Sequence, residues 1–283
     1  MILIADSGST KTDWILMDEN KNQTGYSTIG YNPYFTNSDG IYNSLVLKLT
    51  PQFDAAAIKS VFFYGAGCST PEKETIVHLA LSRCFPNSEL SVKHDLLGAA
   101  RALLGTSKGF AAIIGTGSNT GIYNGSTIET NVDSLGYLLG DEGSGCYIGK
   151  KIIRDFMRVK LPQDLFENFK QVYPLHPADI YDCIYNQPLP NRFLASFCKF
   201  ADQHQHHPYI RKLVKESFVD FFTNLVSSYE NYENYSFNSV GSVAYIFRDL
   251  LKEVAASYCM ETGKIISSPI ASLADYHLQP TET

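Results

Sequence analysis

Alternating apolar and polar positions predict short strands and helices through the first hundred residues. The pattern indicates an antiparallel meander of three strands, followed by strands and helices in alternation. The predicted strands are Ile2–Ala5, Asp13–Asp18, Gln23–Ile29, Ile58–Tyr64 and Leu90–Lys93. Helices are expected from about Ser38, over Pro71–Cys84 and over Asp95–Leu104. This alternation predicts an α/β fold in which helices flank a mixed sheet.

The same order of elements starts again at Gly109, which indicates a second domain of related topology. Residues 144 to about 231 are predicted to be almost wholly helical, with breaks at prolines. The predicted elements are strands at Phe110–Ile114, Thr120–Tyr123, Thr127–Asn131 and Lys264–Ser267, a turn at Asn238–Ala244, and helices over Ala244–Tyr258 and about Pro269 to Leu278. We expect domains at 1–106 and 107–283, with a helical insertion at about 150–231. The last helix is a candidate to pack back on the first domain.

Composition narrows the classes of function. The chain has 283 residues, 44% hydrophobic, and a net charge of −6 without a basic run, so no nucleic-acid footprint is evident. No segment approaches the roughly 18 apolar residues of a membrane span. A strand predicted at Ile2 leaves no room for a signal peptide. The six cysteines are scattered without a C-x-x-C pair, which favours reduced thiols and a cytoplasmic location.

The turn after the first predicted strand combines a carboxylate, a glycine, hydroxyls and a lysine. Asp6 is followed by Ser7-Gly8-Ser9-Thr10-Lys11-Thr12. Such a turn gathers backbone N–H groups, hydroxyls and one ammonium in a small volume that suits a polyphosphate. We assign phosphate binding to Ser9, Thr10 and Lys11, and a water-mediated Mg²⁺ contact to Asp6. A simple polar β-turn uses the same residue types.

A second glycine- and hydroxyl-rich hairpin favours the phosphate interpretation over the simple turn. It consists of Gly115, Thr116, Gly117 and Ser118, and it follows the first strand of the second predicted meander. Two such hairpins in matching places are more specific than one. We therefore assign all four residues to phosphate binding, with ATP as the expected ligand.

Four motifs in order carry a resemblance to a known family. They are D-x-G-S-T-K-T at Asp6, G-T-G-S at Gly115, G-D-E-G-S-G at Gly140–Gly145 and G-S-V at Gly241–Val243. The whole chain resembles the actin/sugar-kinase/Hsp70 ATPase superfamily, and within it the BadF/BadG/BcrA/BcrD ATPase family, especially its N-acetylglucosamine kinase-like branch. The resemblance implies two ribonuclease-H-like domains, with ATP, Mg²⁺ and a sugar bound between them in a closing cleft.

Asp95 is the candidate general base. It follows a short predicted strand and begins a helix, where an aspartate can also serve only as a cap for backbone N–H groups. A sugar hydroxyl is a poor nucleophile, and a carboxylate that takes its proton typically contributes 10²–10⁴-fold. The position also matches the catalytic aspartate of the sugar kinases that the chain resembles.

The resemblance implies sugar contacts at Asn32, Ser134, Gly136 and Asp141. Asn32 lies in Gly30-Tyr31-Asn32, and Asp141 in the G-D-E-G segment; each is also an ordinary turn residue. N-acetylglucosamine kinases tend to have Gly-Trp-Gly before this segment, whereas this chain has Ser134-Leu135-Gly136. The missing aromatic platform leaves open whether the sugar is N-acetylglucosamine, glucosamine, a muramic-acid type or another hexose derivative.

Gly241 and Ser242 are expected to contact the nucleotide, because the glycine lets the backbone approach it and the next helix directs N–H groups toward it. The sequence thus favours an ATP-dependent sugar kinase that acts on a hydroxyl, by resemblance the 6-hydroxyl. Two alternatives remain: an ATPase activator of a 2-hydroxyacyl-CoA dehydratase, which needs cysteines for an iron–sulfur cluster, and a non-catalytic sugar or nucleotide sensor. The oligomeric state stays open, and a homodimer is only what the family suggests.

Overall fold

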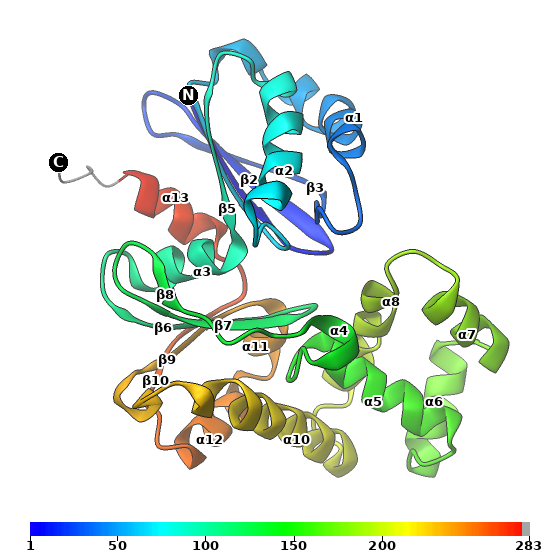
Figure 1. Cartoon of the computed structure of the whole chain (residues 1–283). Coiled ribbons are helices and arrows are strands. Elements are labelled where there is room, and N and C mark those ends of the chain that lie inside the picture. The colour runs from blue at the N-terminus through cyan, green and yellow to red at the C-terminus, as the bar shows by residue number, and fades with distance from the viewer. Residues whose placement is uncertain (279–283) are drawn as a thin grey trace. The chain divides into compact units, whose positions relative to one another are not determined.

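The computed structural model describes residues 1–278 (Figure 1). Its contacts divide the chain into two compact units, each made of more than one segment. Unit 1 comprises Met1–Ala111, Ile122–Thr130 and the chain from Ser268 onward, and unit 2 comprises Ala112–Gly121 and Asn131–Ser267. The chain crosses from unit 1 to unit 2 after Ala111 and back again after Gly121, and both boundaries lie within a strand.

Unit 1 contains a five-stranded mixed sheet in the order β3-β2-β1-β4-β5. β1, β2 and β3 form the predicted antiparallel meander, whereas β4 is parallel to β1 and β5 to β4. The strands are Ile2–Ser7 (β1), Lys11–Met17 (β2), Gln23–Ile29 (β3), Ser60–Gly65 (β4) and Glu89–His94 (β5). The helices are Ser38–Lys48 (α1), Pro71–Cys84 (α2), Asp95–Leu104 (α3) and Ile270–Leu278 (α13), with 3₁₀ turns at Thr50–Gln52 and Ala55–Ala57.

This sheet buries apolar side chains on both faces, because successive residues of a strand point to opposite sides. Leu3 and Trp14 belong to the core that α1 and α2 cover. Ile4 and Ile15 belong to the core on the other face, together with Leu273 of α13 (Figure 1). Burial of each such side chain contributes about 1.5–3 kcal/mol. The last described helix thus completes the core of the first sheet.

Local signals set the ends of the helices in unit 1. The Asn37 side chain accepts the Gly40 N–H (2.9 Å) at the start of α1. Thr70 caps α2, and Pro71 occupies its first position, where no N–H is needed. Gly105 ends α3 with a positive φ of 62°. Of these signals, Pro71 is the one on which the sequence prediction of α2 rests.

The second five-stranded sheet has the order β10-β9-β6-β7-β8. Its strands are Gly109–Ile114 (β6), Ser118–Tyr123 (β7), Ile128–Thr130 (β8), Phe237–Val240 (β9) and Thr262–Ile266 (β10). β7 and β8 pair antiparallel, whereas β9 and β10 run parallel. Two mixed sheets with flanking helices confirm the predicted α/β class with two actin-like ATPase domains.

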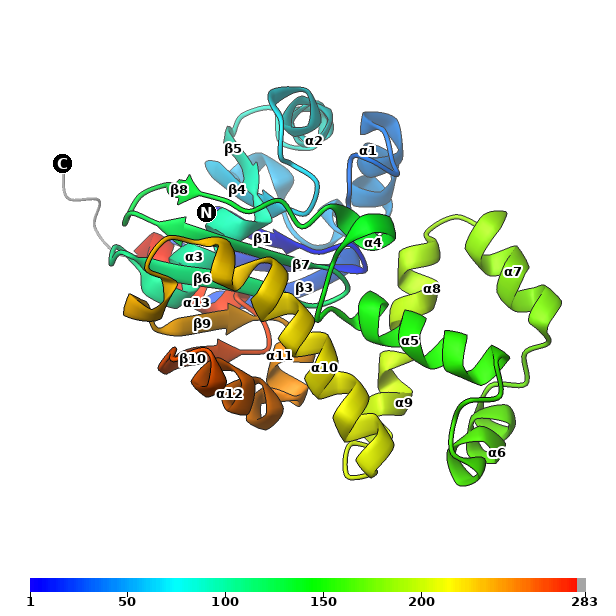
Figure 2. The ribbon, with the colours of Figure 1, turned by 60° about the horizontal axis from the view of Figure 1, so that its bottom comes forward.

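The helices of unit 2 fall mostly in the predicted insertion. In Figure 2, α5 to α9 form a group of neighbouring helices. An aromatic cluster around the fully buried Phe169 holds them together, with ring centroids of Phe156 at 4.5 Å and Phe200 at 5.1 Å. The helices are Gly136–Leu139 (α4), Gly145–Met157 (α5), Gln163–Val172 (α6), Pro177–Tyr185 (α7), Pro190–Ser196 (α8), Cys198–Gln203 (α9), Pro208–Asn224 (α10), Ser242–Ile246 (α11) and Arg248–Ser257 (α12), with 3₁₀ turns at Val226–Ser228 and Tyr232–Asn234.

One predicted element was wrong. The sequence pattern indicates a turn from Asn238, but Phe237–Val240 forms β9, all four of whose residues are buried. The Asn238 side chain is accommodated because β10 is irregular here: its Oδ1 accepts the Lys264 N–H (2.8 Å), and Gly263 has no side chain to displace it. A buried asparagine with these partners is compatible with a strand. The predicted helix after it is divided at Phe247 into α11 and α12.

His277 of α13 anchors this helix to unit 1. Its Nε2 lies 2.9 Å from the Tyr64 hydroxyl, and its ring stacks on Phe62 with centroids 3.9 Å apart. The Arg101 guanidinium donates to the same hydroxyl at 2.7 Å. Burial, and then the charge of Arg101, lower the pKa of His277 to about 4. The folded chain therefore holds this imidazole neutral.

We expect the stability of unit 1 to fall as the pH drops from about 6.5 toward 4. Below its ordinary pKa, His277 takes up a proton in the unfolded chain but not in the folded one, so acid favours unfolding. Because the ring is partly exposed, the loss is on the order of 1 kcal/mol. Thermal melts of His277→Gln should show a weaker pH dependence than the parent. His78 is exposed, and the control variant His78→Gln should have the melting temperature of the parent at each pH. If the melting temperature of His277→Gln depends on pH as steeply as that of the parent, His277 is not the cause of the pH dependence.

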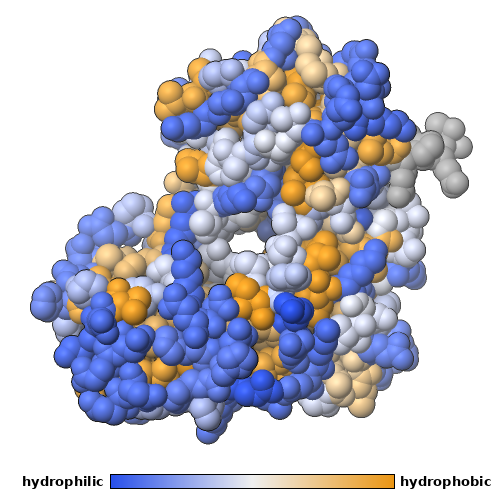
Figure 3. All heavy atoms as spheres, turned by 180° about the vertical axis from the view of Figure 1, so that it is seen from behind, coloured by the Kyte–Doolittle hydropathy of each residue, from blue (hydrophilic) through white to orange (hydrophobic). Residues whose placement is uncertain are grey.

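Among residues 1–278, no helix combines the length and the apolar character that a membrane crossing needs. Seen from behind, hydrophilic residues cover most of the helical part of unit 2, and hydrophobic residues occur between them in small groups (Figure 3).

Candidate functional site

In unit 1, three neighbouring parallel strands end at the same edge of the sheet. Asp6 pairs in register with Tyr64, and Ser7 with Gly65, which in turn pairs with His94. Asp6 near the end of β1 and Asp95, directly after β5, therefore come to one edge although they are far apart in sequence. The carboxyl ends of parallel strands are where α/β proteins place ligands.

The first hairpin is built by its own hydroxyls. Ser7 Oγ lies 2.7 Å from Thr12 Oγ1 and accepts the Tyr31 N–H at 3.1 Å. The Gly8 N–H donates to the Lys11 carbonyl at 2.9 Å, which closes the turn. Ser7 and Thr12 are buried, whereas Thr10 and Lys11 at the tip are exposed. The exposed tip is the part assigned to phosphate binding.

A close backbone approach supports this turn from one side. The Gly30 N–H donates to the Thr10 carbonyl (3.1 Å), and a Cβ at Gly30 would lie only 2.2 Å from the Gly8 carbonyl oxygen. Only glycine fits such a contact. Lys11 Nζ forms an ion pair with Asp13 Oδ1 at 2.7 Å. The ammonium is thus held at the hairpin by a carboxylate two residues further along β2.

Asp6 lies among other carboxyl groups. Burial, then the charges of Asp95 and Asp13, raise its pKa to about 7, against the lowering effect of Lys11. A cation bound here would favour the carboxylate form. Within residues 1–278, no group of three or more His, Cys, Asp or Glu side chains is arranged to hold a metal. The Asp6 carboxylate is an oxygen ligand of the kind that Mg²⁺ accepts, and Mg²⁺ usually keeps several of its waters in proteins.

Asp95 is the first residue of α3 and is partly buried, with 18% of its side chain exposed. Its Oδ1 accepts the Leu96 N–H at 2.8 Å, and His94 Nδ1 accepts from the same N–H at 3.1 Å. Asp95 thus accepts a backbone N–H in the first turn, but the N-cap position that was its alternative interpretation is occupied by His94. The contact uses Oδ1, and for Oδ2 the described residues provide no hydrogen-bond partner.

Asn32 lies against the loop that follows β4. Its Oδ1 accepts the Tyr34 N–H (2.9 Å), and a Cβ at Gly67 would come within 2.4 Å of that oxygen. Cys68, in the same loop, lies near Asp95: burial, Asp95 and Glu74 raise the pKa of its thiol to about 12. Asn32, like Asp6 and Asp95, thus belongs to unit 1.

In unit 2, the second hairpin is joined to the G-D-E-G-S-G segment by three hydrogen bonds. The Gly145 and Cys146 N–H groups at the start of α5 donate to the carbonyls of Gly115 (2.8 Å) and Thr116 (3.1 Å). The Ser118 N–H donates to Asp141 Oδ1 at 3.0 Å. The hairpin is therefore fixed by main-chain contacts on one side and by a carboxylate on the other.

Gly241 brings the third motif of unit 2 to the same strand end. Its φ is 126°, and a Cβ there would lie 2.3 Å from the Ile114 carbonyl oxygen. A Cβ at Gly145 would lie 3.3 Å from Cγ2 of Val243. Ser242 is exposed at the first position of α11. The end of β6 thus collects the second hairpin, the start of α5 and the Gly241 turn.

Ser134 and Gly136 flank the exposed segment before Asp141. The Ser134 carbonyl accepts the Asp141 N–H (2.9 Å), which brings the two predicted sugar residues together. Gly136 begins α4 with a φ of 66° and has open space where a Cβ would stand. Leu135, in place of the usual tryptophan, is 57% exposed. This part of the chain presents apolar side chains to solvent.

Several contributors were missed by the sequence interpretation. His94, Asp13 and Gly30 shape the first site through contacts with Asp95, Lys11 and the hairpin. For His94, the only signal in the sequence is that it directly precedes Asp95. For Asp13 there is none, because composition does not reveal the strand register that pairs it with Asp6.

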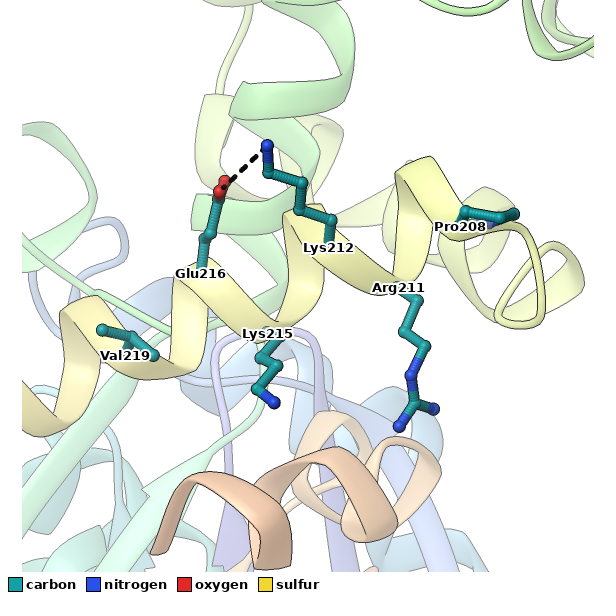
Figure 4. A pocket seen from close by; sticks show the side chains of 6 residues that line it. All are labelled: Pro208, Arg211, Lys212, Lys215, Glu216 and Val219. Carbon is teal, nitrogen blue, oxygen red and sulfur yellow. Dashed lines mark ion pairs between the residues drawn. The ribbon is translucent and has the colours of Figure 1, made fainter. Parts of the chain in front are cut away.

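A pocket of about 440 Å³ lies elsewhere, on α10, and none of the predicted site residues lines it. Its cations are paired: Lys212 with Glu216 at 3.8 Å (Figure 4), and Arg211 and Lys215 with Glu253 of α12. Its lining residues are Pro208, Arg211, Lys212, Lys215, Glu216 and Val219.

Solved structures match this chain over nearly its full length. The putative N-acetylglucosamine kinase from Porphyromonas gingivalis has a TM-score of 0.93 and 41% identity, with 98% of each chain covered. Two further structures share the fold, and each match covers 97% of this chain and 98% of the other. One is the putative N-acetylglucosamine kinase from Chromobacterium violaceum, with a TM-score of 0.69 and 14% identity. The other is a ROK family glucokinase from Streptomyces griseus, solved with glucose and AMPPNP, with a TM-score of 0.55 and 12% identity. No protein-family model and no curated protein sequence matches.

The match to the Porphyromonas gingivalis protein covers 98% of this chain and therefore extends over both units. The chain belongs to the N-acetylglucosamine kinase-like branch of the actin/sugar-kinase ATPase superfamily.

Proposed function

We propose that the protein is an ATP-dependent sugar kinase that transfers the γ-phosphoryl group to a hydroxyl of an amino sugar. The observation that supports this most is the position of Asp95, at the same sheet edge as Asp6 and the first hairpin, in a chain 41% identical to a protein named as a putative N-acetylglucosamine kinase. A carboxylate beside a phosphate-binding hairpin suits transfer to an alcohol better than simple nucleotide storage.

The phosphates of ATP are assigned to both hairpins. Ser9, Thr10 and Lys11 supply an exposed hydroxyl-rich tip and one ammonium, and Gly115–Ser118 supply a second hairpin held in place by α5. The Gly241 turn and Ser242 are assigned to the adenosine part. Asp6 would hold Mg²⁺ through water, and Mg²⁺ when bound supplies charge neutralisation on the phosphates.

Transfer itself needs one proton acceptor. The oxygen of the sugar hydroxyl bonds to the γ-phosphorus while Asp95 Oδ2 takes the proton of that hydroxyl. At the same time the bond between the γ-phosphorus and the β,γ-bridging oxygen breaks, which releases ADP. The hydrogen bonds from the Leu96 N–H to Asp95 Oδ1 and His94 Nδ1 fix the orientation of the carboxylate. Positioning and charge neutralisation contribute most of the rate in such reactions.

The sugar is assigned to Asn32, Ser134, Gly136 and Asp141, with the 6-hydroxyl as the acceptor. Leu135 offers an exposed apolar side chain where a tryptophan is usual, so a sugar with an N-acyl or lactyl group remains a suitable class. The alternative of an iron–sulfur ATPase activator is disfavoured because it needs cysteines that can reach a shared cluster, whereas Cys68, Cys84, Cys146 and Cys198 are buried.

The test is ADP release by the purified protein with Mg·ATP and a panel of sugars. We expect release that depends on one amino sugar among N-acetylglucosamine, glucosamine and N-acetylmuramic acid, with glucose as the sugar without an amino group, and a phosphomonoester on the 6-oxygen of that amino sugar by phosphorus NMR. The matched 6-deoxy sugar should bind without being phosphorylated. Sugar-independent ATP hydrolysis together with an iron–sulfur chromophore would overturn the kinase proposal in favour of the activator.

A further inference from the structure

Asp141 contacts the second hairpin directly. Its Oδ1 accepts the Ser118 N–H at 3.0 Å, and a Cβ at Gly117 would lie only 2.9 Å from this oxygen. A side chain at residue 117 would therefore crowd the carboxylate, and glycine leaves room for it. Gly117 thus has a second function beside the flexibility of the turn, which is to admit the Asp141 side chain.

The backbone of Asp141 is constrained as well. Its φ of 56° lies in the left-handed region, its N–H donates to the Ser134 carbonyl (2.9 Å), and its own carbonyl accepts the Ser144 N–H (3.1 Å). The residue is 9% exposed. Aspartate and asparagine tolerate this conformation better than other side chains, but glycine would adopt it more readily still. A buried acid held in a strained conformation points to a function beyond a turn.

Contacts on two sides fix the hairpin. The N–H groups of Gly145 and Cys146 bind its carbonyls, and Asp141 binds its Ser118 N–H. The Ser118 side chain is also buried, at 5% exposure. Preorganised backbone groups bind a ligand more tightly because they lose less conformational freedom on binding. Without Asp141, the hairpin would lose the acceptor of its Ser118 N–H.

We infer that Asp141 is a positioning residue for the nucleotide, which orders the second hairpin independently of any contact with the sugar. The inference rests on the proposed function, since it assumes that this hairpin binds phosphate. One residue then serves both substrates: its backbone holds Ser134 of the sugar segment, and its side chain holds Ser118 of the phosphate hairpin. Changes at Asp141 should therefore affect nucleotide binding even when no sugar is present.

The experiment measures Mg·ADP binding by calorimetry in the absence of sugar. Asp141→Gly keeps the left-handed backbone but removes the acceptor, and we expect about tenfold weaker binding. Asp141→Asn keeps both the conformation and a side-chain carbonyl, and should bind within about twofold of the parent while losing sugar-dependent turnover. This rescue by asparagine distinguishes positioning of the hairpin from a need for the negative charge.

Gly117→Ala supplies an independent test, because its methyl group displaces the carboxylate while leaving Asp141 in the sequence. It should weaken Mg·ADP binding as Asp141→Gly does. The matched control is Asp249→Asn at the exposed start of α12, which should bind like the parent, and melting temperatures establish that all variants are folded. Parent-like affinity in Asp141→Gly would overturn the inference alone. A parent protein that binds no Mg·ADP would overturn the proposed function, and the inference with it.

Discussion

Asp95→Asn is expected to lower sugar-dependent turnover by at least about 100-fold, with little change in the affinity for Mg·ADP or for the sugar. Asparagine cannot take the proton from the sugar hydroxyl. It still has the Oδ1 acceptor for the Leu96 N–H, so the start of α3 should remain capped. Steady-state ADP release gives the turnover, and calorimetry with each ligand alone gives the affinities.

The control for this variant is Asp54→Asn. The Asp54 side chain also accepts a backbone N–H at the start of a helical turn, from Ala56 at 3.0 Å, but it lies outside the site residues of unit 1. It should keep parent turnover. If Asp95→Asn stays within about threefold of the parent rate, Asp95 acts only as a cap of α3 and another base must be sought.

Gly30→Ala should damage both the fold of unit 1 and nucleotide binding. The added methyl group would lie 2.2 Å from the Gly8 carbonyl oxygen and 2.7 Å from the Ser9 carbonyl, so the hairpin backbone has to move. Crowding of this kind typically costs about 1–3 kcal/mol, and backbone atoms have less freedom to relax than side chains. We expect a loss near the upper end of that range in urea unfolding, and Mg·ADP binding weakened at least about tenfold.

Gly25→Ala is the matched control, because Gly25 lies in β3, the strand that Gly30 directly follows, and a Cβ there would have the Trp14 carbonyl oxygen, at 4.0 Å, as its nearest neighbour. Alanine is preferred over glycine inside a strand, so its stability should equal or slightly exceed that of the parent. A Gly30→Ala protein that unfolds and binds like Gly25→Ala would show that the hairpin does not need the close approach of β3.

The sequence was sufficient for features that depend on local chemistry. The capped and proline-led helices α1 and α2, the meander β1–β3 and the glycine-rich motifs are all defined by near neighbours in the chain. The family was recognisable for the same reason, since its motifs are short and ordered. Asp95 could be proposed as a base because a strand end is visible in the sequence pattern.

Features that depend on strand register and side-chain insertion could not be predicted. The Asn238 side chain of β9 fits beside β10 because residue 263 is glycine. In the sequence, however, asparagine and glycine are each residues typical of turns. The contact of Asp141 with Ser118 likewise joins two segments whose proximity exists only in the folded chain. The register that sets Asp13 opposite Asp6 is likewise defined only once the two strands pair.

The helix α13 has a consequence for the order in which the protein folds during synthesis. It supplies Leu273 and Ala274 to the core around Ile4, yet the whole of unit 2 is translated before it. Until α13 emerges from the ribosome, the nascent first sheet keeps one apolar face incompletely covered. That face is a surface on which chaperones would act, and a stop codon shortly before α13 should yield a chain whose defect lies in the unit that was synthesised first.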